Sequence, residues 1–216
     1  MAAVCLSNGS SMKHYCDLKA RVISAAVLLF LCALAICSGG YAVYSSVLLL
    51  AVLSYQEWQD MTANKGVVLR CLGLFVAILP NAALIGIHIE DVEILIWLIV
   101  CVVSNDVGAY FIGRIIGGVK LCKSVSPNKT VSGFLGGLLS TFVCGSTFAI
   151  VLGLSMNFVL LTLPIAVLAT IGDLFESFIK RTCSVKDSGT LLPGHGGILD
   201  RVDGFIFSAP FLFFCL

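Results

Sequence analysis

The sequence predicts an all-α, polytopic integral membrane protein with about seven transmembrane helices and a cytoplasmic N-terminus. Of its 216 residues, 59% are hydrophobic and only 12% are charged, whereas soluble domains carry about 25% charged residues. The mean hydropathy is +1.06, and several charge-free runs approach the length needed to cross a bilayer. The net charge of +1 carries little information by itself, so the positions of the charges matter more.

The chain is expected to form one membrane domain, because no segment repeats and none is of low complexity. Residues 1–20 form a short cytoplasmic lead, and residues 21–216 form the membrane-embedded domain. Basic residues precede the first apolar run, but no small-residue cleavage site follows it. We therefore expect an uncleaved first span rather than a signal peptide.

The expected spans are separated by local breaks in the apolar pattern. Gly39-Gly40 divides the first two spans, and Leu154 to Asn157 divides the long run after residue 131. Pro80-Asn81 is expected to break the third span, and Trp58 to anchor a helix end at the interface. The spans are expected at about 22–37, 41–55, 67–87, 94–113, 131–153, 158–172 and 205–216.

The basic residues follow the positive-inside pattern. With these spans, every lysine and arginine falls on the side of the N-terminus, in residues 13–21, 65–70, 114–129 and 180–201. The opposite loops are acidic (88–93) or neutral (154–157). This distribution predicts that both large polar loops face the cytoplasm, where nucleotides are available.

Ten cysteines are scattered along the chain without any C-x-x-C pair. Several fall inside predicted spans, where cysteine behaves as a small apolar residue. A disulfide or zinc framework is therefore not expected.

The most charged stretch is S-F-I-K-R-T-C-S-V-K-D-S-G-T-L-L-P-G-H-G-G-I-L-D-R-V-D, from Ser177 to Asp203, which we call the signature loop. Its glycines around Pro193 predict an ordered turn rather than a continued helix. Lysine and arginine bind phosphate oxygens, carboxylates hold hard cations, and glycine lets backbone N–H groups approach an anion. The stretch therefore predicts a site for phosphate and metal.

Acidic residues flank this loop on both sides. Asp173, Glu176, Ser177 and Lys180 have the spacing of one helix face. Two interpretations stay open: a Glu176–Lys180 salt bridge that closes the helix end, or a cavity in which Asp173 helps to hold a metal. Asp200 and Asp203 can point into one site if a helix begins near Leu199. His195 either contacts phosphate, orients a carboxylate or is an ordinary loop residue.

A second polar constellation runs from Asn105 to Gly137. Asp106 lies near the middle of a predicted span, which makes it a functional candidate, with a hydrogen-bonded buried aspartate as the alternative. Lys129-Thr130 precedes a glycine-rich helix start and predicts an anion site. The basic residues here could also be ordinary positive-inside anchors; they are Arg114, Lys120, Lys123 and Lys129.

Both constellations resemble the CDP-diacylglycerol synthase (phosphatidate cytidylyltransferase) family. The signature loop is similar to the family pattern S-x-x-K-R-x4-K-D-x-G-x2-L-P-x-H-G-G-x-x-D-R-x-D. The earlier segment resembles N-D-x-x-A-Y-x-x-G-R followed by S-P-x-K-T-x-E-G, except that Ser132 stands where the family has glutamate. A further difference is that the family often carries more spans before the N-D motif.

The resemblance implies transfer of CMP from CTP to phosphatidic acid, giving CDP-diacylglycerol and pyrophosphate in phospholipid biosynthesis. It implies Mg²⁺, with room for a second monovalent or divalent cation, and two aspartates matching Asp173 and Asp200 as metal ligands. The implied catalytic residues are Asp173, Lys186, Asp187, His195, Asp200, Arg201 and Asp203. The implied substrate-binding residues are Asp106, Arg114, Lys120, Lys129, Thr130, Ser177, Lys180, Arg181, Gly196 and Gly197.

The same resemblance implies a cytidylyltransferase domain over residues 21–216, with its catalytic half at about 104–216. The expected location is a bacterial-type inner membrane with the site on the cytoplasmic side. CTP, phosphatidic acid and membrane lipids are the implied partners; a homodimer stays open, and nucleic acid is not expected.

Three other functions remain alternatives. A CTP-dependent kinase of a polyprenol-type alcohol, or a CDP-lipid synthase for another lipid, would keep the same scaffold. The G-H-G-G-x-x-D-R-x-D ending favours the phosphatidate enzyme over both. An ion-coupled transporter could use Asp106 as its ion site, but the polar groups gather in two loops on one side instead of at the midplane. No G-x-x-x-x-G-K-[ST] motif is present, which excludes a P-loop.

Overall fold

The structure is a computed structural model that describes residues 27, 30–191 and 196–216. The described part is mostly helical, as predicted, and residues 30–37 form a helix before Gly39. A small antiparallel hairpin joins two of the helices, where the sequence predicted only a basic loop. The elements are α2 (Gly40–Met61), α3 (Val67–Glu90), α4 (Val92–Ile116), β1 (Lys120–Cys122), β2 (Ser126–Thr130), α5 (Val131–Val151), α6 (Met156–Thr182), α7 (Leu199–Val202) and α8 (Phe205–Cys215).

Within the described residues, four helices are long and apolar enough to cross a membrane: α3, α4, α5 and α6. The helix α8 is apolar but shorter, and α2 is not among the four. The protein is therefore a multi-pass membrane protein, and the prediction of about seven spans is confirmed only in part. The predicted lead at 1–20, and the start of the first predicted span, lie outside the described residues.

Two of the three predicted breaks in the apolar pattern are confirmed, while α2 extends beyond the predicted end at 55 to Met61. Gly39 has φ of +97° and immediately precedes α2, and the break between α5 and α6 falls at Leu152–Ser155. The expected break at Pro80 is wrong, because α3 runs through it without interruption. Pro80 has no N–H to donate to the Val76 carbonyl, and it is buried, where neighbouring helices allow a membrane helix to tolerate proline.

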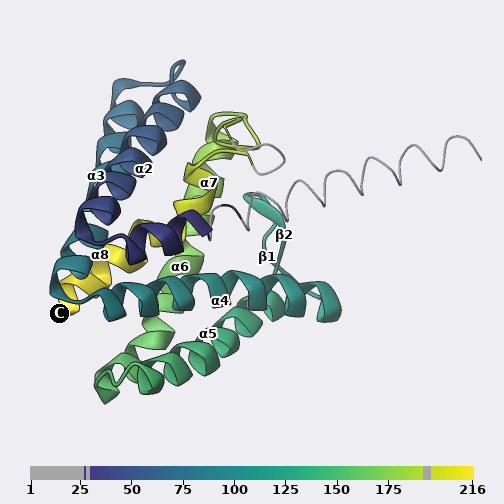
Figure 1. Cartoon of the computed structure of the whole chain (residues 1–216). Coiled ribbons are helices and arrows are strands. Elements are labelled where there is room, and N and C mark those ends of the chain that lie inside the picture. Colours follow the sequence, from purple (N-terminus) through teal and green to yellow (C-terminus); the bar gives the residue numbers. More distant parts are fainter. Residues whose placement is uncertain (1–26, 28–29, 192–195) are drawn as a thin grey trace, which may run out of the picture.

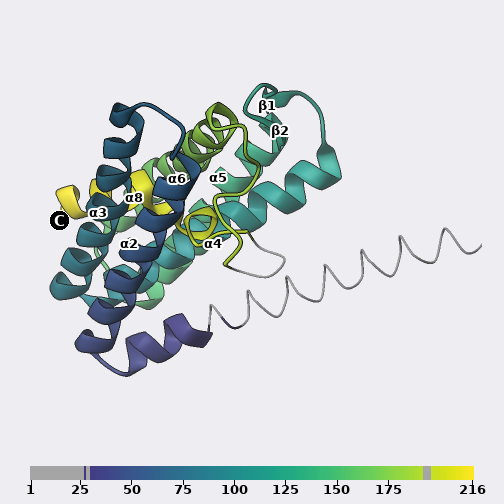
Figure 2. The ribbon, with the colours of Figure 1, turned by 90° about the horizontal axis from the view of Figure 1, so that it is seen from above.

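The helices form two close pairs that α6 and α8 connect. In both views α2 lies beside α3 and α4 beside α5 (Figure 1, Figure 2). Glycines allow α4 and α5 to approach closely: a Cβ on Gly108 would lie 2.1 Å from the Ser140 hydroxyl, and one on Gly137 would lie 2.6 Å from the Asn105 side-chain oxygen. Helix α6 contacts α4, α5 and α8, so the end of α6 that leads into the signature loop carries polar residues into the centre of the molecule.

Trp58 belongs to the core, so the prediction of an interfacial anchor is wrong. Its side chain is 0% exposed, and its indole N–H donates to the Leu69 carbonyl (2.8 Å). The ring stacks on Phe175 of α6, with ring centroids 6.5 Å apart. The buried ring packs α2 against α6, and its hydrogen-bonded N–H joins α2 to α3.

Candidate active site

A cavity of about 560 Å³ gathers most of the polar residues that precede the signature loop. Helices α4, α5 and α6 and the β1–β2 hairpin all contribute to its lining. Six of the predicted site residues line this one cavity: Asp106, Arg114, Lys120, Lys129, Thr130 and Asp173. Asn105, Tyr110 and Asn128 add uncharged polar groups.

The start of α5 lies at the wall of the cavity. Thr130 is the N-cap residue, and its Oγ1 accepts a hydrogen bond from the Gly133 N–H (3.0 Å). The Val131 N–H is also occupied, since it donates to the Val119 carbonyl (2.9 Å), so it is the positive end of the helix dipole that favours an anion at this position. The neighbouring Lys129 pairs with Asp173 of α6, so a cation and a helix N-terminus lie together.

Ser132, which stands where the family pattern has glutamate, binds the backbone. Its hydroxyl donates to the Gly117 carbonyl (2.5 Å) and lies 3.0 Å from Thr130 Oγ1. These contacts connect the end of α4 with the start of α5. Among the described residues, the carboxylates that line the cavity are therefore Asp106 and Asp173.

Arg114 and Tyr110 form an exposed pair on α4 at the cavity wall. The guanidinium donates to the Tyr110 hydroxyl (2.7 Å) and lies 6.0 Å from the centre of its ring. Tyr110 is 58% exposed. The arrangement presents a cation that an incoming phosphate can reach.

Several acidic side chains lie close enough to interact electrostatically with the cavity carboxylates. The charges of Asp106 and Asp173 repel one another, while Lys129 and Arg201 oppose that repulsion. Burial, and after it the charges of Asp173, Glu176 and Asp106, raise the pKa of Asp203 well above its ordinary value. Each of these carboxylates therefore disfavours the charged form of its neighbours.

The α6 helix face shows the predicted salt bridge and places Asp173 at the cavity, while a metal at Asp173 stays a prediction. Glu176 is fully buried and pairs with Lys180, as the salt-bridge interpretation predicted. Asp173 lines the cavity, as the functional interpretation predicted, and the Ser177 hydroxyl donates to it (3.4 Å). The two roles are compatible because they occupy successive turns of one helix.

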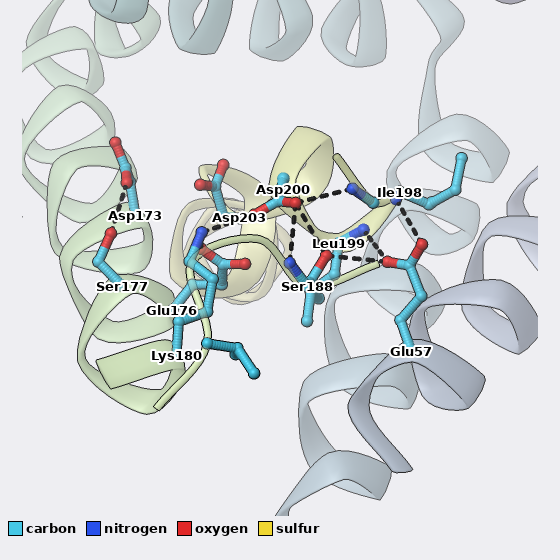
Figure 3. Close-up of polar contacts among 12 residues, drawn as sticks. Glu57, Asp173, Glu176, Ser177, Lys180, Ser188, Ile198, Leu199, Asp200 and Asp203 are labelled. Carbon is cyan, nitrogen blue, oxygen red and sulfur yellow. Dashed lines mark hydrogen bonds and ion pairs between the residues drawn. The ribbon is translucent and has the colours of Figure 1, made fainter. Parts of the chain in front are cut away.

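Asp200 lies in a second polar cluster, formed by the signature loop (Figure 3). Lys180 donates to its Oδ1 (2.6 Å), and the N–H groups of Ser188 (3.0 Å) and Gly197 (2.8 Å) donate to its Oδ2. Burial alone would raise the pKa of Asp200, but the bonds from Lys180 and the backbone outweigh burial and lower it. Asp200 is not among the residues that line the cavity.

The other predicted loop residues have varied surroundings. Arg181 donates to the carbonyls of Val125 and Val185 (both 3.2 Å) and so connects the loop with the hairpin. Lys186, Asp187 and Arg201 are exposed, and Asp203 lies between α7 and α8. His195 lies outside the described residues. Gly196 has φ of +81° and approaches Asp200.

Sequence reasoning missed Glu57, which reaches the same loop from α2. Its carboxylate accepts hydrogen bonds from Ser188, Ile198 and Leu199, although the sequence marked this region only as a helix end at the membrane interface. An acidic residue directly after a long charge-free run was the available signal.

The donor set of the cavity fits Mg²⁺ bound together with a phosphorylated substrate. Mg²⁺ commonly takes one or two carboxylates and completes its shell with phosphates and water, and Asp106 and Asp173 supply two carboxylates. Within the part of the chain that the structure describes, no group of three or more His, Cys, Asp or Glu side chains could hold a metal. The eight described cysteines are free.

The fold and the site define a class of protein: a multi-pass helical membrane protein with a mixed basic and acidic cavity suited to phosphate groups. The model of the cytidylyltransferase family matches residues 68–216. The chain belongs to the cytidylyltransferase family.

Several curated relatives are phosphatidate cytidylyltransferases. The chain is 33% identical to that of Rickettsia bellii over 213 residues, which is 94% of this chain and 92% of the relative. It is 50% identical to that of Bacillus subtilis over 121 residues, 54% of this chain and 45% of the relative. It is 39% identical to that of Helicobacter pylori strain J99 over 172 residues, 78% of this chain and 61% of the relative. The matches thus span nearly all of one relative but only about half of the Bacillus enzyme.

Proposed function

We propose that this protein is a CTP:phosphatidate cytidylyltransferase that makes CDP-diacylglycerol and pyrophosphate from CTP and phosphatidic acid. The observation that carries the proposal is the cavity in which Lys129, the N-terminus of α5 and two carboxylates lie together. CTP and phosphatidic acid are both polyanions, which suits this lining. The relatives from Bacillus subtilis and Rickettsia bellii are named phosphatidate cytidylyltransferases.

The reaction is a nucleotidyl transfer. A phosphate oxygen of the lipid attacks the α-phosphorus of CTP and forms a new P–O bond. The bond from the α-phosphorus to the bridging oxygen breaks, and its electron pair leaves with pyrophosphate. The attacking oxygen is already anionic, so no serine or cysteine nucleophile is needed, and the main obstacle is repulsion between the two substrates.

The basic residues of the cavity reduce that repulsion. Arg114, Lys120 and Lys129 supply positive charge, and the N–H groups at the start of α5 supply fixed dipoles. A phosphate group that enters the cavity competes with Asp173 for Lys129, since both are anions. Substrate binding would then release the Asp173 carboxylate for another cation.

Mg²⁺ is the proposed cofactor, and Asp173 is its proposed ligand from the cavity. Asp106 is the other carboxylate in the lining, and Asp200 is the second ligand that the family resemblance implies. When bound, Mg²⁺ would neutralise phosphate oxygens and withdraw electron density from phosphorus. A second monovalent or divalent cation fits the remaining acidic charge.

The signature loop is proposed to hold the second polar part of the site. Lys180 orients Asp200, Ser177 holds Asp173, and Arg181 fastens the loop to the hairpin. The remaining members of the proposed site are Lys186, Asp187, His195, Gly196, Gly197, Arg201 and Asp203. The positive-inside pattern supports a cytoplasmic site in an inner membrane, and a homodimer is compatible with it.

The test is transfer of labelled CMP from CTP to phosphatidic acid in detergent micelles with Mg²⁺. The parent chain is expected to form labelled CDP-diacylglycerol, and Asp173→Asn and Asp200→Asn almost none. Asp60→Asn is the matched control, because Asp60 is an exposed acid on α2 outside both polar clusters. Absence of transfer by folded parent protein to phosphatidic acid would overturn the proposal. A polyprenol tested in parallel, with CTP labelled in its γ-phosphate, would reveal a kinase.

A further inference from the structure

Glu57 is a buried carboxylate that contacts the signature loop from the opposite end of the sequence. Its side chain belongs to α2 and is 4% exposed. Oε1 accepts the Ile198 N–H (2.9 Å), while Oε2 accepts the Leu199 N–H (2.9 Å) and the Ser188 hydroxyl (3.0 Å). Figure 3 shows Glu57 reaching across to these three residues from its own helix.

These hydrogen bonds compensate for burial of the charge. A buried carboxylate is strongly destabilising unless donors replace its lost water, and bonds to a charged acceptor are stronger than those between neutral groups. Two of the donors are the backbone N–H groups of Ile198 and Leu199, at the start of α7. Glu57 therefore contacts the backbone where α7 begins.

The glycines of the loop leave room for this carboxylate. A Cβ on Gly189 would lie 2.6 Å from Glu57 Oε1. A Cβ on Gly197 would lie 2.3 Å from Glu57 Oε2 and 2.1 Å from the Ser188 hydroxyl. Both positions therefore need glycine for Glu57 to fit, which indicates that the loop is packed closely against this side chain.

Ser188 connects Glu57 with Asp200. Its hydroxyl lies 3.0 Å from Glu57 Oε2 and 3.0 Å from Asp200 Oδ2. A hydroxyl carries one proton, so it donates to one carboxylate at a time, while its backbone N–H donates to Asp200 throughout. The position of Asp200 therefore depends on the contacts that Glu57 makes.

We infer that Glu57 is a positioning residue for the active site, which holds the signature loop so that Asp200 and Arg201 at α7 are presented correctly. Glu57 precedes residues 68–216, the segment that the family model matches, so the front part of the chain contributes to the site. The catalytic consequence of this inference rests on the proposed cytidylyltransferase function, but the structural consequence does not.

The structural consequence is tested by hydrogen exchange on the full chain in detergent, followed by mass spectrometry. Glu57→Gln keeps the shape of the side chain, but its amide nitrogen cannot accept a hydrogen bond. Exchange in the peptide that contains Ile198 and Leu199 is expected to become about tenfold to a hundredfold faster, because one backbone N–H loses its acceptor and the other keeps only a neutral one. Asp60→Asn, on the same helix, is expected to exchange like the parent. Unchanged exchange in Glu57→Gln would overturn the inference, even if the protein had no transferase activity.

The catalytic consequence is tested by steady-state kinetics. Glu57→Gln is expected to lower kcat on the order of tenfold, the loss typical of a misplaced catalytic group, while KM for CTP stays within about twofold because the cavity itself is untouched. A rise in KM with unchanged kcat would contradict a positioning role.

A second variant keeps the inference testable if Glu57→Gln does not fold. Ser188→Ala removes the bridging hydroxyl and leaves both backbone bonds to Glu57 in place. We expect kcat to fall at nearly constant KM for CTP, with exchange at Ile198 and Leu199 as in the parent. Parent kcat in Ser188→Ala, with Glu57→Gln unfolded, would overturn the inference.

Discussion

The hydroxyl of Ser188 lies 3.0 Å from both Glu57 Oε2 and Asp200 Oδ2. Glu57 belongs to α2 and Asp200 to α7, so one small side chain joins the front of the chain to the signature loop. The cavity is a separate polar region, where Asp173 pairs with Lys129. The site therefore has two polar parts, and α6 contributes a residue to each: Asp173 to the cavity and Lys180 to the loop.

Gly197→Ala is expected to destabilise the loop, because the added methyl group would overlap Glu57 and Ser188. Forcing a methyl group into a packed site costs about 1–3 kcal/mol. The measurement is thermal unfolding in detergent together with CMP transfer. Gly66→Ala is the matched control, since a Cβ there meets nothing within 4 Å; equal effects of the two substitutions would contradict the packing argument.

Lys129→Ala is expected to raise KM for CTP by roughly tenfold, because the substitution removes a cation from the cavity and leaves Asp173 to repel the phosphates. The paired side chains are about a quarter exposed (26% and 28%), so little loss of stability is expected from the ion pair itself. Lys123→Ala serves as the control, because Lys123 is exposed and does not line the cavity. A similar KM in both variants would argue against phosphate binding by Lys129.

Thr130→Val is expected to destabilise the start of α5 by about 0.5–2 kcal/mol, because it removes the N-cap oxygen that accepts the Gly133 N–H. Thr130→Ser retains that oxygen and is expected to behave like the parent. Thermal unfolding and KM for CTP are measured in both variants. The comparison separates the effect of losing the N-cap oxygen from the effect of changing the size of the side chain. Equal stability of the Thr130→Val and Thr130→Ser proteins would show that the cap contributes nothing.

The Asp200 contacts are expected to make stability fall in acid. The pKa of Asp200 is lowered from 3.8 in the folded protein, so its contribution is complete well above that value and is lost as pH falls toward the lower folded pKa. Unfolding temperature measured between about pH 6 and pH 3 should drop less steeply in Asp200→Asn than in the parent. Parallel curves for the two proteins would contradict this assignment.

Much of the fold followed from local sequence patterns. Runs of apolar residues predicted α3, α4, α5 and α6, because the hydropathy of a span is a property of one segment. The hairpin between α4 and α5 escaped prediction, since its strands are short and polar and depend on pairing such as Lys120 with Thr130. The continuous helix through Pro80 also escaped prediction, because whether a membrane helix tolerates a buried proline depends on its packing against neighbouring helices.

The sequence by itself determined that this is a multi-pass membrane protein. It also determined where the charged groups lie along the chain: in a basic and acidic segment before α5, and in the charged, glycine-rich signature loop. Only the tertiary structure decided which groups meet. It pairs Lys129 with Asp173, places Asp200 beside Lys180, and brings Glu57 to Ile198 and Leu199, partners separated by 141 and 142 positions. The physical reason is that residue types and local periodicity specify single helices, whereas contacts between distant carboxylates and backbone N–H groups form only when those helices pack together.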